Sequence, residues 1–401
     1  MTNRYPGGII NAAKPTIVAA VGGEGGTASG IWSMEQYAYH SKNNLWVKPI
    51  LTKTLWVWGK NTYAQLGLGN TTNRSSPVQV GTLTTWLAAS SNYNNSAAIN
   101  KNGTLWVWGG NASGQLGLGD TVTRSSPVQV GILTNWLNVV CGSYHTVATK
   151  TDGTLWAWGR NAYGQLGDGT TSYRSSPVQV GALMTWSFIS ASTNNSAAIK
   201  TDGTLWTWGY NVMGQLGLGN TTNRSIPVQV GALMNWSKVA CGDLYTIAIK
   251  TDGTLWSWGD NSTGQLGLGN TTNYSSPKQV GALMNWSSIS SGWTAWNSIK
   301  TNGTLWSCGS GYGGIHAQAD TTNRSSPVQI GSSLNWEKST IGAYHALAIK
   351  TDGTLWSWGY NSEGQLGLGN TTNYSSPKQV GITTWSSISA APYGTIAIQQ
   401  S

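Results

Sequence analysis

Short runs of alternating apolar and polar residues recur along the chain at a spacing of fifty residues. The phrase "TDGTLWSWGYN" begins at Thr351, and nearly the same letters begin at Thr151, Thr201 and Thr251. Alternation with a period of two is typical of β-strands, because successive side chains point to opposite faces. Helical periodicity is absent throughout the repeated part of the chain. The pattern therefore predicts an all-β fold.

Each copy of the repeat contains four strand-like pieces. The segment "AIKTDGTLWSWG" reads as two strands joined by Asp-Gly or Asn-Gly, which is the strongest short-range signal for a hairpin. "SSPVQVG" is a short strand entered by a proline, and "NWSSIS" is the fourth strand. The Leu-Trp pair of the phrase falls at Leu55, Leu105, Leu155, Leu205, Leu255, Leu305 and Leu355. Seven units of four strands predict a seven-bladed β-propeller.

The two ends of the repeated region complement each other. The first copy starts at "TKTLWVWG" without the "W…IS…AIK" half, and the missing half appears from Trp385 to Ile398. One blade is thus expected to combine strands from Leu55 onward with C-terminal strands. Such a closure removes the exposed edge strands that an open stack would leave. The sequence does not tell which strand of a blade is innermost.

The phrase "WGxNxxGQLGLGN", found at Trp258 to Asn270 and Trp358 to Asn370, resembles the signature of the regulator of chromosome condensation repeat family. The resemblance covers residues 54–398 and implies a seven-bladed propeller. It does not imply one function, because a fold hosts many. Members of that family include a nucleotide-exchange factor for a small GTPase, an inhibitor of β-lactamase and a plant ultraviolet receptor. The sixth copy departs from the signature, with "SCGSGYGGIHAQADTTNR", and is either a decaying blade or a specialised contact.

Composition narrows the class of function. Only 9% of the residues are charged, whereas the chain has 53 Gly and 24 Trp, and such a surface is common in rigid β-structures that work outside cells. The formal net charge of +9 is spread about once per repeat rather than clustered, which argues against nucleic-acid binding. Cys141 and Cys241 share a repeat position, and equivalent positions in separate blades are too far apart for a disulfide, so they read as small buried residues. Cys308 stands where other copies have the second Trp of "LWxWG", which also suggests a packing site.

No constellation of residues predicts catalysis. The Asp residues of the Asp-Gly pairs read as turn residues, and no two carboxylates are placed as an acid and base pair. His145 and His345 share a repeat position that other copies fill with Asn, Tyr, Ala or Gly. We therefore expect no enzyme activity, no cofactor and no metal. The two Trp of "LWxWG", which point to one face of the strand, are expected to fill the space between neighbouring blades.

Two loops differ from copy to copy and are the candidate binding surfaces. The loop that precedes the "AIK" strand offers the ligand-binding candidates Tyr93, Tyr144, Tyr245, Trp293, Trp296, Tyr344 and Tyr393. The loop that follows "LWxWG" offers Tyr63, Tyr163, Tyr210, Tyr312 and Tyr360. Aromatic rings beside Asn and Ser suit recognition of carbohydrate or protein surfaces, since a ring adds contact area at low entropic cost. Alternatively, these rings only cap the central channel.

Residues 1–53 lie outside the repeat and are expected to form an anchor or linker, with 54–401 as the propeller. Ser33 and Gln36 are placed as a capping box, which predicts a short helix from about Met34 to Ser41. The pattern "GGTASGIWSMEQ" is similar to short modules in structural proteins of marine tailed phages. Neither a secretory signal nor a membrane span is visible in the sequence.

These observations lead to one main expectation and two alternatives. The main one is a non-enzymatic binding or display module of a phage virion (a tail-fibre, receptor-binding or capsid-decorating protein). It would recognise a host surface glycan or protein and attach to other virion proteins through residues 1–53. The first alternative is a soluble partner-binding propeller, such as an enzyme inhibitor or small-GTPase regulator. The second is a purely structural subunit of an ordered array.

Overall fold

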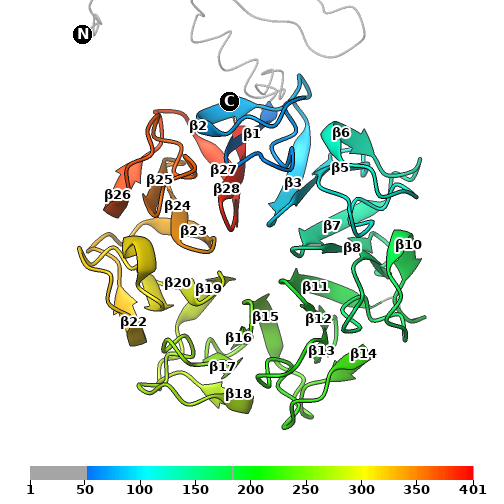
Figure 1. The fold of residues 1–401 in the computed structure, drawn as a ribbon. Helices are drawn as coiled ribbons and strands as arrows, with labels where there is room; N and C mark the ends of the chain where they lie inside the picture. Colours follow the sequence, from blue (N-terminus) through cyan, green and yellow to red (C-terminus); the bar gives the residue numbers. More distant parts are fainter. Residues whose placement is uncertain (1–51, 183–184, 401) are drawn as a thin grey trace, which may run out of the picture. The chain divides into compact units, whose positions relative to one another are not determined.

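Seven four-stranded antiparallel sheets stand in a ring in the computed structural model, which describes residues 52–182 and 185–400 (Figure 1). The predicted all-β, seven-bladed propeller is confirmed. We number the blades by their Leu-Trp copy, so that blade 1 contains Leu55 and blade 7 contains Leu355. The predicted anchor, residues 1–53, lies outside the described residues except for Thr52 and Lys53. Lys53 is the first residue of β1. The helix predicted near Met34 also lies outside the described residues.

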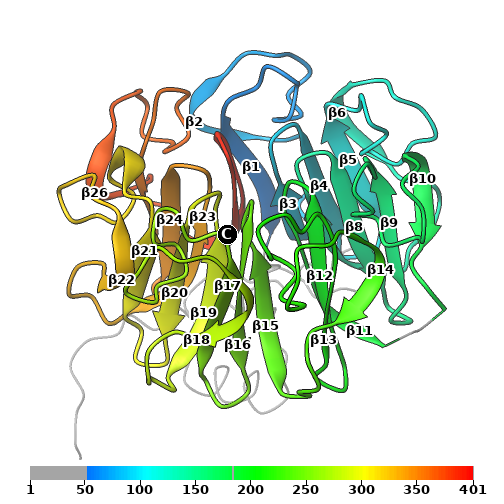
Figure 2. The same ribbon diagram turned by 60° about the horizontal axis from the view of Figure 1, so that its bottom comes forward.

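The strands of each blade occupy four positions from the axis outward. The innermost strands are β27 (Trp385–Ala391), β3 (Trp86–Ser91), β7 (Trp136–Cys141), β11 (Trp186–Ala191), β15 (Trp236–Cys241), β19 (Trp286–Ser291) and β23 (Trp336–Ile341). The second strands are β28 (Gly394–Gln400), β4 (Asn95–Asn100), β8 (His145–Lys150), β12 (Asn195–Lys200), β16 (Tyr245–Lys250), β20 (Ala295–Lys300) and β24 (His345–Lys350). Neighbouring innermost strands contact one another around the axis (Figures 1 and 2).

The outer half of each blade carries the repeated phrase and the proline strand. The third strands are β1 (Lys53–Gly59), β5 (Leu105–Gly109), β9 (Leu155–Gly159), β13 (Leu205–Gly209), β17 (Leu255–Gly259), β21 (Leu305–Gly309) and β25 (Leu355–Gly359). The outermost strands are β2 (Arg74–Gln79), β6 (Arg124–Gln129), β10 (Arg174–Gln179), β14 (Arg224–Gln229), β18 (Tyr274–Gln279), β22 (Arg324–Gln329) and β26 (Tyr374–Gln379). Within the described ranges the one helical element is a 3₁₀ turn, η1 (Tyr312–Gly314).

Blade 1 closes the ring as the sequence predicts. Its strand order is β2-β1-β28-β27, so that N-terminal and C-terminal strands share one sheet. The register pairs Leu55 with Ile398 and Lys53 with Gln400. Blade 1 therefore completes the ring, and each blade is flanked by a neighbouring blade on either side.

The hydrophobic core lies in the gaps between blades. The second Trp of "LWxWG" is fully buried in six blades and donates its indole N–H to a backbone carbonyl of the preceding blade, for example Trp258 to Gln215 at 2.9 Å. Gly217, with a φ of +72°, makes room for this ring, because a Cβ at that position would lie 2.7 Å from Trp258. The first Trp is half-buried and packs against the same clusters, as Trp156 does beside Trp158. The expectation that both rings fill the space between blades is confirmed.

Blade 6 rebuilds the same contact with different residues. Cys308 stands where the other blades have the buried Trp, and Trp296 lies opposite it on the neighbouring strand. The Trp296 ring is fully buried and donates to the carbonyl of Gln265 at 2.8 Å, the carbonyl that corresponds to Gln215 in the blade before. Trp296 is therefore a core residue, and the expectation that it belongs to an exposed binding loop is wrong.

Candidate functional site

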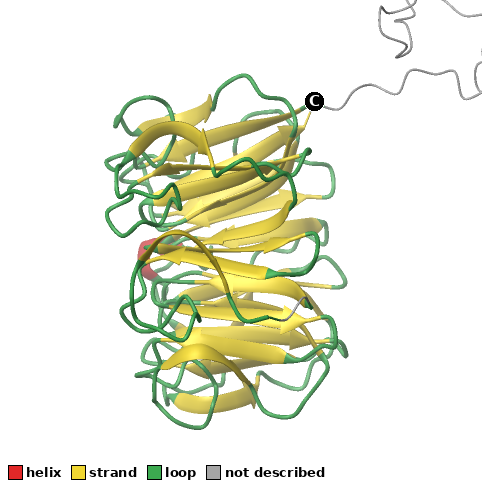
Figure 3. Ribbon diagram, turned by 90° about the vertical axis from the view of Figure 1, so that its right-hand side faces the viewer, coloured by secondary structure: helices red, strands yellow, loops and turns green. Residues whose placement is uncertain are grey.

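Both variable loops lie at the same end of the strands. The second strand starts where the third strand ends, as in the pairing of His145 with Gly159. The loop before the second strand and the loop after the third are consequently neighbours, with Tyr63 and Tyr93 rings 6.4 Å apart. Figure 3 shows the loops gathered at the two ends of the strands. The Asp-Gly turns occupy the opposite end of the ring.

Five of the seven predicted aromatic residues meet over the axis. We call Tyr93, Tyr144, Trp293, Tyr344 and Tyr393 the axial aromatic cluster. They come from blades 2, 3, 6, 7 and 1, and each is half-buried. Tyr93 and Trp293 belong to blades on different sides of the ring, yet their ring centroids are 6.3 Å apart and the rings are stacked. The cluster therefore spans the mouth of the central channel.

The contacts within the cluster are continuous. Trp293 lies 5.8 Å from Tyr344 and 5.9 Å from Tyr393, both in edge-to-face geometry. Tyr93 lies 6.1 Å from Tyr144 and 6.2 Å from Tyr393. Separations of this size are those at which aromatic pairs attract each other. The five rings thus form one platform rather than five separate side chains.

Rings of the other variable loop extend this platform outward. Tyr312, at the tip of blade 6, lies 4.6 Å from Tyr344 and is 53% exposed. Tyr360 lies 5.8 Å from Tyr312. On the other side Tyr163 lies 4.5 Å from Tyr210. The two candidate loops of the sequence are therefore one surface.

Charged groups that the sequence analysis did not single out border the cluster. Lys60 places its ammonium 5.1 Å from the Tyr393 ring, and the Arg160 guanidinium lies 5.5 Å from Tyr144. Burial raises the pKa of Asp243, although a hydrogen bond from Thr193 acts against this. Burial also raises the pKa of Tyr344. Lys60 and Arg160 each follow a "LWxWG" phrase directly. Because the second and third strands pair as a hairpin, both variable loops lie at one end, and this pairing could have predicted that the two cations lie beside the aromatic residues.

Tyr245 does not belong to the surface. It is the first residue of β16, it is fully buried, and its hydroxyl donates to the carbonyl of Ala295 at 2.6 Å. Burial raises the pKa of its hydroxyl well above the ordinary value. The expectation that Tyr245 is an exposed binding residue is therefore wrong. Like Trp296, it lies where the loop has already become a strand, and the strand directs it inward.

The channel below the cluster is lined mostly by small residues, together with larger apolar ones such as Phe188 and Ile289. A cavity of about 220 Å³ runs among the innermost strands, with Ser90, Cys141, Ser190 and Cys241 in its wall. Both cysteines are free and buried, and burial raises the pKa of each thiol to about 12. His145 is also buried, which lowers its pKa to about 3. At neutral pH these groups are uncharged, and none is exposed as a nucleophile.

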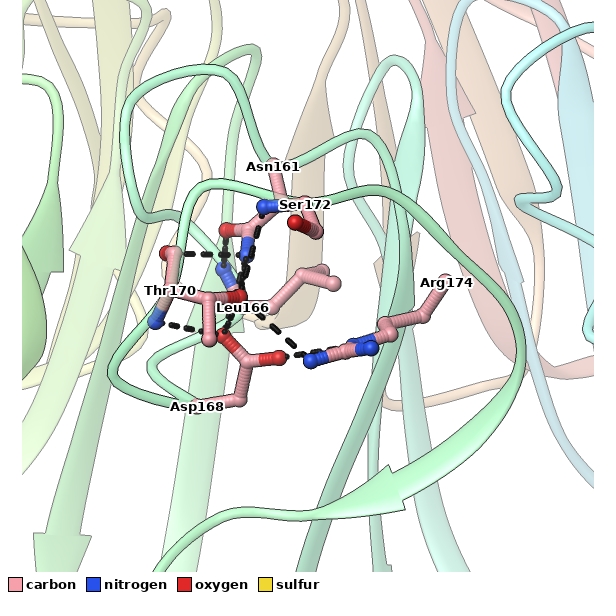
Figure 4. Close-up of polar contacts among 6 residues, drawn as sticks. All are labelled: Asn161, Leu166, Asp168, Thr170, Ser172 and Arg174. Carbon is pink, nitrogen blue, oxygen red and sulfur yellow. Dashed lines mark hydrogen bonds and ion pairs between the residues drawn. The ribbon is translucent and has the colours of Figure 1, made fainter.

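The loop after "LWxWG" is held by its own polar network, shown for blade 3 in Figure 4. Asn161 accepts a hydrogen bond from the backbone of Leu166 at 2.9 Å and donates to the carbonyl of Thr170 at 3.0 Å. Asp168 accepts from Asn161 at 3.0 Å and forms an ion pair with Arg174 at 2.8 Å. The repeated Asn is therefore a structural residue, and the loop presents its aromatic side chains from a fixed backbone.

The described parts of the chain contain neither a candidate metal-binding group nor a candidate membrane-spanning helix. No three His, Cys, Asp or Glu side chains within residues 52–182 and 185–400 are grouped so that they could hold a metal ion. Over the same residues, the chain forms no helix that is long and apolar enough to span a bilayer.

Two protein-family models match the chain, and both carry the same description. The model described as "Regulator of chromosome condensation (RCC1) repeat" matches residues 54–99, 102–149, 152–199, 202–249, 252–295 and 352–398. A second model with the same description matches residues 136–165, 186–215 and 236–265. None of these matches covers residues 296–351, the part of the chain in which Cys308 and His316 replace the usual residues. Among curated proteins, no sequence matches the chain.

Solved structures share the fold at low sequence identity. Human WBSCR16 is similar over 86% of this chain and 98% of its own, with a TM-score of 0.78 and 19% identity. Yeast RCC1 (Prp20), solved bound to Kap60, is similar over 87% of this chain and 89% of its own, with a TM-score of 0.78 and 17% identity. Saccharomyces cerevisiae Prp20p, described with its binding properties to Gsp1p and histones, gives 0.76 and 18%, over 87% and 92%.

Proposed function

The chain belongs to the regulator of chromosome condensation (RCC1) repeat family, and we propose that it is a non-enzymatic propeller that binds a protein partner through the face carrying the axial aromatic cluster. The observation that carries this proposal is the platform of half-buried Tyr and Trp rings bordered by Lys60 and Arg160. Tyr, Trp and Arg are the residue types enriched at the energetic centres of protein interfaces. The proposal corresponds to the first alternative expected from the sequence.

The structural relatives support a protein as the partner. Prp20 was solved bound to Kap60, and its binding to Gsp1p and histones is described. At 17–19% identity these likenesses carry the fold and not the identity of a partner. We therefore propose the class of ligand, a folded protein or peptide, and leave its name to experiment.

Rigidity of the scaffold gives this face a physical advantage in binding. The rings stand on loops whose backbones are fixed by networks such as that of Asn161 and Asp168. Side chains that are already ordered lose little conformational entropy when a partner docks. The alternative that the rings only cap the channel accounts for their meeting over the axis, but it leaves exposed rings such as Tyr63 and Tyr312 without a role.

The phage-virion expectation stays a prediction. It depends on the module similarity within residues 1–53, nearly all of which lie outside the described residues. No feature of the propeller favours a host glycan over a protein, or a virion over another location. The structural-array alternative likewise has no observation of its own.

The test is a binding comparison with matched variants on the two ends of the ring. The full chain, tagged, is used to isolate partners from its native source, and the affinity of each purified partner is then measured. We expect Trp293→Ala combined with Tyr344→Ala to weaken binding by about a hundredfold or more. The control is Leu283→Ser combined with Met284→Ser, which lie 51% and 64% exposed outside the aromatic face. Equal binding by the aromatic variant, or loss only in the control, would overturn the proposal.

A further inference from the structure

The gaps between blades open outward into pockets that the aromatic face does not use. Between blades 4 and 5 lies a pocket of about 530 Å³, lined by Trp236, Trp256, Lys250, Arg224 and Leu233, among others. The gap between blades 2 and 3 holds an equivalent pocket of about 580 Å³, and the gap between blades 7 and 1 one of about 450 Å³. These volumes are those of ordinary small-molecule sites.

Lys250 brings a cation into the pocket between blades 4 and 5 without an acidic partner. Its ammonium lies 3.8 Å from the Trp256 ring centroid and 5.0 Å from that of Trp236. The side chain is 6% exposed, and among the described residues no carboxylate lies within ion-pair distance of it. Burial lowers the pKa of Lys250, although the charge of Asp252 acts against this. Contact with two rings offsets part of the cost of burying the charge.

Arg224 adds a second unpaired cation to the same lining. In blades 2, 3 and 6 the equivalent Arg forms an ion pair, as Arg124 does with Asp120 at 2.6 Å. In blade 4 Asn220 stands at the position of Asp120, and no described carboxylate lies within ion-pair distance of Arg224. No Asp or Glu lines the pocket. Its lining therefore carries two positive charges and no negative one.

We propose that the pocket between blades 4 and 5 binds a small amphiphilic carboxylate, with its anionic head against Lys250 and Arg224 and its apolar body against Leu218, Leu233 and Pro277. A carboxylate supplies the acceptor that both cations lack, and charge-assisted hydrogen bonds are the stronger kind. The apolar wall removes the rest of the ligand from water. This inference is independent of the protein partner proposed for the aromatic face.

The other two pockets are controls built into the same chain. Between blades 2 and 3 Lys150 keeps its place over Trp136 and Trp156, but Arg124 is already paired with Asp120. Between blades 7 and 1 Gln399 takes the place of the Lys, and no Lys or Arg lines the pocket. The shapes are alike while the charge decreases from one pocket to the next. Occupancy by a carboxylate is expected to decrease in the same order.

The test uses 4-bromobenzoate as the probe and 4-bromobenzyl alcohol as its neutral control. In crystals of the full chain soaked with the acid, the anomalous bromine signal is expected to be strongest between blades 4 and 5. The soak with the alcohol is expected to give a weaker signal there. Equal signals in all three pockets, equal signals from the two compounds, or none from the acid, would overturn the proposal.

Calorimetry in solution tests the assignment to particular residues. Lys250→Met, which keeps the volume of the side chain, is expected to weaken binding of 4-bromobenzoate by about tenfold. Arg224→Gln, on an outermost strand, is expected to act in the same direction. The matched control Lys150→Met removes the same charge from another gap and is expected to leave the strongest site unchanged. Equal losses in the Lys150 and Lys250 variants, or none in the Lys250 and Arg224 variants, would contradict the assignment.

Discussion

The gaps between the blades and the axial mouth of the ring are built from the same seven copies, but their residues vary in different ways. In the gaps one contact recurs, in which a buried indole donates to a carbonyl of the preceding blade, as Trp158 does to Gln115. At the mouth the equivalent residues differ, and Tyr144 corresponds to Asn194 in the next blade and to Leu244 in the one after. Packing dictates the first set, whereas it leaves the residue type open at the positions of the second set, where we propose that a partner binds.

The largest expected effect concerns blade 6, in which Trp296 replaces the buried indole that the other blades carry at the position of Cys308. Trp296→Ser should lower the free energy of unfolding by about 3–5 kcal/mol, because it removes a fully buried ring and leaves a cavity. Adding Cys308→Trp should restore most of this loss. In blade 4 the same pair, Ser196 and Trp208, shares the carbonyl of Gln165, with both distances at 2.9 Å. Chemical denaturation of the two variants gives the comparison.

These variants form a double-mutant cycle. If the double variant is no more stable than Trp296→Ser alone, the exchange of one ring for the other is contradicted. The single variant Cys308→Trp completes the cycle. We expect that variant to be destabilised as well, since two large rings would compete for the place that Trp296 now fills.

The next effect concerns the mouth. Trp293→Ala should change the free energy of unfolding by only about 1 kcal/mol, since the ring is half-buried and contributes mainly aromatic contacts. Its effect on partner binding should be larger, about 2 kcal/mol or more. Thermal or chemical unfolding measured beside affinity separates the two quantities. A loss of stability as large as that of Trp296→Ser would place Trp293 with the core instead.

A pH dependence distinguishes the polar network of the loops from the apolar gaps. Burial acts to raise the pKa of Asp168, but hydrogen bonds from Thr170 and Arg174 outweigh it and the pKa is lowered. Because the folded pKa lies below the unfolded one, this carboxylate stabilises the fold above about pH 4, and that contribution is lost as the pH falls through the folded pKa. Asp168→Asn should cost about 1–2 kcal/mol at pH 7.

The cost of Asp168→Asn should begin to shrink as the pH falls below about 4, where the carboxyl of the unfolded chain takes up its proton, and should approach zero only at a pH below the lowered pKa of the folded protein. Unfolding curves of both proteins at pH 7, 5 and 3 provide the measurement. A cost that does not depend on pH would show that the charge of Asp168, and with it the contacts that lower its pKa, contributes nothing to stability.

The smallest effect tests backbone strain in blade 6. Ala319 has a φ of +60°, at the position where Gly269 stands in blade 5 with a φ of +76°. Ala319→Gly should stabilise the protein by about 0.5–1 kcal/mol, because glycine adopts this conformation without a steric penalty. The matched change Gly269→Ala meets no atom closer than 3.7 Å and should destabilise by a similar amount. We expect the melting temperature to rise in Ala319→Gly and to fall in Gly269→Ala, relative to the unmodified protein. Changes of the same sign in both variants would contradict this account.

The fold could be predicted from the sequence because the framework residues recur in seven copies at a spacing of fifty residues. Leu55 to Leu355 mark the third strands, and Trp385 to Ile398 complete the first blade, as the structure confirms. The site was predicted less completely. The variation between copies predicts that Tyr245 and Trp296 lie on an exposed loop. In the structure Tyr245 is the first residue of its second strand, Trp296 lies within its own, and both are buried. The exchange of Trp296 for the missing ring at Cys308 depends on a cross-strand contact, and a single sequence does not display such contacts.

The central claim is that the aromatic face, and not the rest of the surface, binds the partner. Hydrogen exchange of the full chain with and without its purified partner tests it most directly, because backbone protection locates an interface. We predict slower exchange in residues 92–94, 142–144, 292–294, 342–344 and 391–394. Protection confined to the opposite end, in turns such as residues 281–285 and 331–335, with none at Trp293 and Tyr344, would contradict the claim.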